Sequence, residues 1–138
     1  MPAIGAFRLV FRLGQIAIKV PRLKNFAAGM RCNRWEREMW TTWRPVFGWE
    51  NLCPILAADP FGFVVIMERG QQPVTEVEAL EAFRIDYWPD VGAESKPENF
   101  GRVGDRVLVI DYGIDDAELV RRRRRYLRTH PRAASRSP

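Results

Sequence analysis

The sequence predicts an α+β fold in which a small antiparallel sheet packs against one long helix and a smaller helical part follows. Three features predict it: two segments typical of β-hairpins, one long stretch with apolar residues at helical spacing, and further helical stretches after the hairpins. The 138 residues are enough for one hydrophobic core. We therefore expect a single domain over residues 1–129 and a disordered basic tail over residues 130–138.

The first hairpin is predicted for residues 7–20, which alternate as a half-buried hairpin does on both sides of Gly14. Pro21 ends its second strand, because proline has no amide hydrogen to donate. The second hairpin is predicted for residues 52–58 and 62–68, joined by a turn that contains Asp, Pro and Gly.

Residues 26–43 contain few helix breakers and predict one amphipathic helix that stops near Pro45. A shorter helix is predicted for residues 74–87, with Thr75 as its cap. The apolar stripe of the long helix consists of Cys32, Trp35, Met39 and Trp43, and that of the short helix of Val77, Leu80 and Ile85.

The last third of the chain contains one predicted strand between less regular segments. Residues 88–101 are rich in Pro, Gly, Asp, Glu and Asn and predict a loop. Residues 106–111 predict a strand that follows a turn, and residues 115–129 predict a helix.

The positive charge is concentrated at the C-terminal end. Residues 1–120 hold 14 of the 22 basic residues and all 17 acidic ones, whereas residues 121–138 hold eight arginines and no acid. The run Arg121–Arg125 could bind nucleic-acid phosphates or an acidic protein surface, or it could neutralise the acidic residues just before it. No apolar run approaches the ~20 residues of a membrane span and no signal-peptide pattern is present, so we expect a cytoplasmic protein without membrane contact.

Cys32 and Cys53 are the only cysteines, and His130 is the only histidine. Their spacing makes no zinc pattern. The cysteines could form a disulfide or be two buried free thiols. His130 lies in the tail, so catalysis by a serine or cysteine with histidine is set aside.

Lys19 is the first candidate for chemistry, because it closes an apolar strand where a charge is costly unless an acid pairs with it. Glu38 lies beside the apolar stripe of the following helix and could be that acid. Such a pair would hold the ammonium group where a phosphate could bind it. The alternative is an exposed lysine at a strand end and an exposed glutamate on a helix.

Asp111 is the second candidate, because it ends an apolar strand and is followed by Tyr112 and Gly113. Asn99 lies twelve residues earlier, in the preceding loop. If the fold brings them together, an amide oxygen and a carboxylate could ligate Mg²⁺. Taken alone, Asn99 could equally be a turn former.

Read together and in order, these segments resemble the protein kinase family, in a truncated form that keeps the nucleotide-binding half over residues 1–70 and a reduced helical part over residues 71–129. The matching segments are Ile16-Ala17-Ile18-Lys19 for V-A-I-K, Glu38 for the helix glutamate, Val65-Ile66-Met67-Glu68 for the strand before the hinge, Lys96-Pro97-Glu98-Asn99 for K-P-E-N and Asp111-Tyr112-Gly113 for D-F-G. Residues 5–10 resemble part of the glycine-rich loop, with Arg8 in place of a glycine.

The resemblance implies that the chain binds ATP and Mg²⁺. Lys19 would contact the α- and β-phosphates with Glu38 orienting it, while Asn99 and Asp111 would hold Mg²⁺. Met67 would be the gatekeeper, Glu68 to Gly70 the hinge that meets adenine, and Gly5 part of the loop over the phosphates.

Two departures from the family bear on catalysis. Glu94 stands five residues before Asn99, where kinases carry a catalytic aspartate, and Asp90 is the alternative; Lys96 of the same loop is a further candidate. Only 25 residues follow Gly113, too few for a peptide-binding platform.

Three functions are therefore open. The chain could be a minimal Mg-ATP-dependent phosphotransferase, or a pseudokinase that acts by binding another protein, with a protein partner or a homodimer expected. The third is a module that binds nucleic acid or a host protein through Arg121–Arg125 without catalysis.

Overall fold

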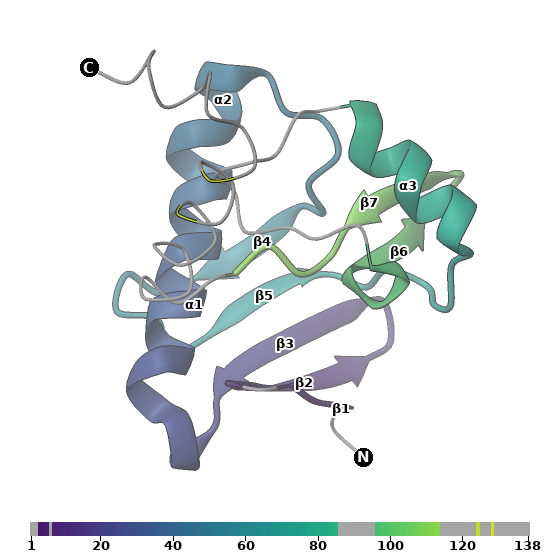
Figure 1. The fold of residues 1–138 in the computed structure, drawn as a ribbon. Helices are drawn as coiled ribbons and strands as arrows, with labels where there is room; N and C mark the ends of the chain where they lie inside the picture. The colour runs from purple at the N-terminus through teal and green to yellow at the C-terminus, as the bar shows by residue number, and fades with distance from the viewer. Residues whose placement is uncertain (1–2, 6, 86–95, 114–123, 125–127, 129–138) are drawn as a thin grey trace.

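The computed structural model describes residues 3–5, 7–85 and 96–113, together with Arg124 and Arg128. Over these residues the chain is a small α+β protein with a small antiparallel sheet and a long helix (Figure 1). In this view α1 (Phe26–Glu38) lies at one end of the strands and α3 (Glu76–Ile85) at the other. The predicted α+β class is confirmed.

The main sheet has five antiparallel strands in the order β1-β2-β3-β5-β4, and it contains both predicted hairpins. Gly14 makes the turn of the first with a φ of 57°, which glycine adopts readily. Asp59 shapes the connection in the second by accepting hydrogen bonds from three backbone amides. The strands are β1 (Ala3–Ile4), β2 (Arg8–Leu13), β3 (Ile16–Pro21), β4 (Ile55–Ala58) and β5 (Val65–Glu68).

The long helix continues beyond its predicted end. α1 runs without a break into a π-helical segment (Met39–Trp43) and then α2 (Arg44–Phe47). Pro45 is the second residue of α2 and directly follows the π-helical segment, so this proline does not end the helical path. The helical path ends instead at Gly48, whose φ of 66° favours glycine.

The buried face of α1 differs from the predicted stripe. Its buried residues are Gly29, Cys32, Asn33 and Glu36, and Met39 follows on the same face. Trp43, which the stripe included, is exposed. Two polar side chains, Asn33 and Glu36, therefore point into the interior against the main sheet.

A second sheet of two strands follows α3. It consists of β6 (Phe100–Val103) and β7 (Arg106–Val109), which is the main part of the strand predicted for residues 106–111. The predicted loop through residue 101 is wrong at its end, because Phe100 and Gly101 pair with β7. A short 3₁₀ turn (Pro97–Asn99) leads into β6.

Two glycines allow this second sheet to approach the end of β5. A Cβ atom on Gly101 would lie 2.7 Å from the Cα of Gly70, and one on Gly70 would lie 2.9 Å from the Cα of Gly101. Backbone hydrogen bonds of 2.8 Å in both directions between Gln71 and Arg102 close the same junction. The absence of side chains at this point lets two backbones lie in contact.

One hydrophobic core extends across both sheets and α3. It explains why α3 turns its alanines inward: Ala79 and Ala82 are buried, whereas Val77 and Leu80 are exposed, so the predicted apolar face is wrong. The predicted cap is confirmed, because Thr75 Oγ1 accepts a hydrogen bond from the amide of Glu78 at 3.1 Å. The largest fully buried apolar side chains are Tyr112, Phe100, Leu52, Met67, Val65, Val109 and Cys53.

Other expectations are settled in part. Cys32 and Cys53 are buried free thiols, so the disulfide alternative is wrong. No helix among the described residues is both long and apolar enough to cross a membrane. The predicted helix over residues 115–129 and the tail over residues 130–138 lie outside the described residues, apart from Arg124 and Arg128, which are exposed.

Candidate functional site

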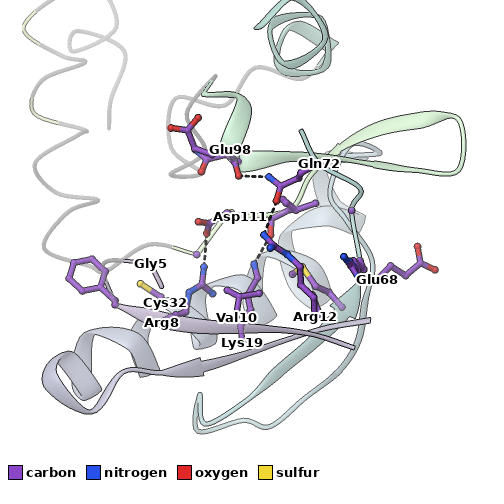
Figure 2. A pocket seen from close by; sticks show the side chains of 18 residues that line it. Gly5, Arg8, Val10, Arg12, Lys19, Cys32, Glu68, Gln72, Glu98 and Asp111 are labelled. Atoms are coloured by element: carbon purple, nitrogen blue, oxygen red, sulfur yellow. Dashed lines mark hydrogen bonds and ion pairs between the residues drawn. The ribbon is translucent and has the colours of Figure 1, made fainter. Parts of the chain in front are cut away.

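A cavity of about 470 Å³ lies between the main sheet and the segment that carries β6 and β7. Figure 2 shows its charged side chains, which come from β2, β3, the end of β5 and the residues on either side of the second sheet. The lining includes four basic and three acidic residues. Seven of the residues predicted for the site line it together, namely Gly5, Lys19, Met67, Glu68, Gly70, Asn99 and Asp111.

Lys19 is held on the buried face of β3 by an acid from α1. Its Nζ donates to Glu36 Oε1 at 2.6 Å and to the carbonyl oxygen of Ile110 at 2.5 Å. Lys19 is 3% exposed and Glu36 is fully buried, so neither charge is compensated by bulk water. The predicted pair of a strand lysine and a helix acid exists, and it ties β3 to α1 and to the end of β7.

The helix acid in this pair is Glu36, and the prediction of Glu38 is wrong. Glu38 is exposed, and its carboxylate accepts a hydrogen bond from the indole of Trp43 at 3.3 Å. The spacing of α1 explains the difference: Glu36 lies four residues after Cys32 and three before Met39, which places it in the middle of the buried stripe. That spacing in the sequence could have identified Glu36.

Arg8 is the site residue that sequence reasoning missed. It lies on β2, is 7% exposed, and its guanidinium group donates to Asn33, Glu36 and Asp111 (Figure 2). The shortest of these contacts are 2.7 Å to Glu36 Oε2 and 2.5 Å to Asp111 Oδ1. An arginine on the first strand of a hairpin gives no sign of burial, because its partners come from residues 33, 36 and 111.

Asp111 and Asn99 are adjacent through the backbone. The carbonyl oxygen of Asn99 accepts from the amide of Ile110 at 2.8 Å and from the amide of Asp111 at 3.4 Å. The carboxylate of Asp111 is half-exposed toward the cavity, with one oxygen held by Arg8. The structure therefore places Asn99 and Asp111 side by side in the lining of one cavity, which is the condition that the sequence analysis set for a shared site.

The two residues after Asp111 connect the chain that follows β7 to Glu36 through backbone hydrogen bonds. The amides of Tyr112 and Gly113 both donate to Glu36 Oε1 at 3.1 Å. Tyr112 is fully buried, its hydroxyl donates to the carbonyl of Cys53 at 2.9 Å, and burial raises the pKa of this hydroxyl well above its usual value. Asp111 is therefore fixed at the mouth of the cavity by its neighbours.

The magnesium ion that the kinase resemblance implies does not fit this arrangement. Asp111 Oδ1 already accepts from Arg8, so a cation on that carboxylate would lie beside a guanidinium of the same sign. At ~4 Å, two like unit charges near a protein surface repel by roughly 4 kcal/mol, and this ion carries two charges. No group of three or more acidic, histidine or cysteine side chains that could hold a metal ion is found among the described residues. Mg²⁺ at Asn99 and Asp111 stays a prediction that Arg8 argues against.

The segment after β5 offers one backbone donor to a ligand. The amide of Glu68 donates to Pro54 at 3.0 Å and that of Arg69 to Gln15 at 2.8 Å, so both are committed to the fold. Within the described part of the chain, the amide of Gly70 has no such partner, and Gly70 lines the cavity. Met67, the predicted gatekeeper, lies on β5, is buried and lines the cavity.

A chain of polar side chains crosses one side of the cavity. Arg12 on β2 donates to the side chain of Gln72 at 3.0 Å, and Gln72 donates to the backbone oxygen of Glu98 at 3.0 Å (Figure 2). These contacts join the first hairpin to the segment before β6. All three residues line the cavity.

Of the three predicted catalytic residues, only Lys96 is described. Glu94 and Asp90 lie outside the described residues. Lys96 is exposed and does not line the cavity. Of the run Arg121–Arg125, only Arg124 is described, and it is exposed.

The charges around Glu36 lower its pKa. Burial by itself raises the pKa of a carboxyl group, but Arg8 and Lys19 outweigh burial and lower the pKa of Glu36 from 4.5 to about 2. Burial likewise lowers the pKa of Arg8, but the carboxylates of Glu36 and Asp111 outweigh it, so the pKa lies above its usual value. Both groups are charged at neutral pH, and the cluster of Arg8, Lys19, Glu36 and Asp111 is electrically balanced.

This shift predicts a loss of stability in acid. Because the pKa of Glu36 is lower in the folded protein, the unfolded chain binds the proton more tightly, so the contribution is complete above pH 4.5 and is lost toward pH 2. We expect the free energy of unfolding to fall by roughly 3 kcal/mol over this range from Glu36 alone. Urea unfolding at a series of pH values measures this decrease in the free energy of unfolding. We expect the decrease between pH 4.5 and pH 2 to be lost in Glu36→Gln and kept in Glu38→Gln. An unchanged slope in Glu36→Gln would contradict the assignment.

A comparison of the sequence with protein families found no match, and a comparison with curated proteins found none either. The class of the chain therefore rests on its fold and its cavity. These define a small α+β protein with a charged cavity between a five-stranded sheet and a hairpin. Lys19, Arg8 and Asp111 line this cavity, Arg8 pairs with Asp111, and the fully buried Glu36 pairs with both Lys19 and Arg8.

Proposed function

We propose that this chain is a truncated kinase-like protein that binds ATP in the cavity at Lys19. The observation that carries the proposal is that Lys19, paired with Glu36 of α1, lines the same cavity as Asn99, Asp111 and the segment Met67 to Gly70. These are the groups that the family resemblance assigns to the phosphates and to adenine. They come from distant parts of the sequence and meet in one place.

The cavity has the size and the groups that a nucleotide needs. Its volume of about 470 Å³ lies in the range of ~300–1,000 Å³ typical of small-molecule sites. Among the groups that line it, the amide of Gly70 and the apolar side chains of Val10, Ala17 and Met67 suit a base, and Lys19 suits phosphate. Two of the three Nζ hydrogens of Lys19 are engaged by Glu36 and Ile110, which leaves one for a phosphate oxygen.

Binding without transfer is the reading that the contacts favour. Asp111, which would position a metal ion in a kinase, is held by Arg8 instead. The proposed role is therefore that of a pseudokinase that binds another protein or a second copy of itself. Phosphoryl transfer is measured separately, by incubating the protein with γ-labelled ATP. Labelled phosphate on the chain or on a partner protein, absent in Asp111→Ala, would identify a phosphotransferase.

Thermal unfolding with and without ATP tests the proposal. At a hundred times its Kd, ATP should stabilise the native protein by ~2.7 kcal/mol and raise the melting temperature. Lys19→Met should weaken binding by about 10- to 100-fold, because it removes one charge-assisted hydrogen bond worth ~1.5–3 kcal/mol. The variant remains testable because Glu36 keeps Arg8 and two backbone amides as partners.

Lys24→Met is the matched control, since Lys24 is exposed in the turn Leu23–Asn25 and lies away from the cavity lining. We expect it to bind ATP as the unmodified protein does. The proposal fails if neither ATP, ADP nor GTP shifts the unfolding of the unmodified protein, or if both lysine variants weaken binding equally.

A further inference from the structure

The guanidinium group of Arg8 lies where it neutralises Asp111. Its two terminal nitrogens donate to Asn33 Oδ1 at 3.1 Å, to both oxygens of Glu36 at 2.7 and 3.3 Å, and to Asp111 Oδ1 at 2.5 Å. All four terminal N–H groups are therefore used, and the side chain has one defined position. In Figure 2 it rises from β2 directly beneath Asp111.

The backbone on the opposite side is shaped to receive this group. A Cβ atom on Gly113 would lie 2.8 and 2.9 Å from the two terminal nitrogens of Arg8. Any other residue at position 113 would force the guanidinium away from Asp111 or move the chain. The glycine after Tyr112 therefore leaves room for a cation of the protein itself.

The charge balance shows what this cation contributes. Without Arg8, one lysine would face the carboxylates of Glu36 and Asp111, and the cluster would carry a net negative charge that repels phosphate. A kinase-like site overcomes that charge with a divalent ion. Arg8 does so here with a covalently attached charge, and it leaves Lys19 as the donor toward a phosphate oxygen.

We propose that Arg8 takes the place of the divalent cation, so that this cavity binds the polyphosphate tail of a nucleotide in metal-free form. The inference rests on the proposed nucleotide binding and adds the form of the ligand: ATP or ADP binds without needing a magnesium ion. Asp111 then serves to position Arg8, and the Asp111 carboxylate contacts no metal.

Isothermal titration of the unmodified full chain with ATP, in EDTA and in excess Mg²⁺, tests this directly. We expect the two Kd values to agree within about threefold. A Kd that rises about tenfold or more in EDTA would overturn the inference and leave nucleotide binding intact. Absence of binding in both buffers would remove the proposed function and this inference together.

Charge variants give a second, independent readout. In Arg8→Gln the carboxylate of Asp111 is no longer neutralised, so we expect the Kd for ATP in EDTA to rise at least about tenfold and Mg²⁺ to restore it. In the double variant Arg8→Gln/Asp111→Asn the charge is balanced again, and the dependence on Mg²⁺ should vanish. Arg12→Gln is the control on the same strand: it also lines the cavity, and its ratio of Kd values in the two buffers should stay near one. A ratio of Kd values near one in Arg8→Gln as well would count against the inference.

The unmodified chain also allows a test that needs no variant. Titration with Mn²⁺ alone, followed by electron paramagnetic resonance of the free ion, should detect no stoichiometric site. One Mn²⁺ bound per chain, released by Asp111→Asn, would overturn the inference.

Discussion

Glu36→Ala is expected to lower the free energy of unfolding by about 3–5 kcal/mol, because it removes the acid that two buried cations share. Arg8 and Lys19 would remain buried with their main counter-charge lost, and the amides of Tyr112 and Gly113 would lose their acceptor. Urea unfolding at neutral pH measures the difference. Near-UV circular dichroism at zero urea checks that the variant is folded.

Glu38→Ala is the matched control on the same helix two residues away. Its side chain is exposed, and its hydrogen bond to Trp43 is a surface contact, so we expect a change within about 0.5 kcal/mol. Equal losses in the two variants would show that the helix, and no buried charge cluster, is responsible. If Glu36→Ala does not fold, the milder Glu36→Gln should still be less stable than Glu38→Gln.

Gly101→Ala is expected to destabilise the protein by about 3 kcal/mol, the upper part of the range for overpacking. The new Cβ would lie 2.7 and 2.8 Å from the Cα and carbonyl carbon of Gly70, and a backbone on the facing side cannot rotate away as a side chain can. The second sheet must then separate from the end of β5. Because Gly70 lines the cavity, we also expect the affinity for ATP to fall in the same variant.

Gly104→Ala separates this steric effect from the general cost of replacing a glycine. Gly104 lies on the same hairpin with a φ of 63°, and a Cβ atom there would meet nothing within 4 Å beyond its own chain neighbours. We expect a loss of about 1 kcal/mol from backbone strain alone and no change in ATP affinity. Similar losses in both variants would show that the contact between Gly70 and Gly101 contributes little.

The separate elements of the site were largely predictable, because each depends on neighbours in the chain. Lys19 stands out in an apolar strand, and Asp111 stands out at the end of another. Their meeting in one cavity was predicted from the order of the motifs, and the structure brings them together with Asn99. Glu36 could have been found from helical spacing alone, since it lies between Cys32 and Met39 on one face.

Arg8 could not have been found in this way. Exposed and buried arginines on a short strand look the same in a sequence, and what distinguishes them is whether acids from elsewhere reach them. Here those acids are 28 and 103 residues away along the chain. The same holds for Gly70 and Gly101, whose contact is visible only when the two backbones meet.

The amino-acid sequence by itself determined the α+β class, both hairpins, the long helix, the cap of α3 and the residue types available for a phosphate site, because these follow from periodicity and local backbone preference. Only the tertiary structure decided which charges meet. It paired Lys19 with Glu36 in place of Glu38 and inserted Arg8 between that acid and Asp111. The physical reason is that burial makes each charge depend on its nearest partner, and the nearest partner in space is set by packing, which adjacent residues do not encode.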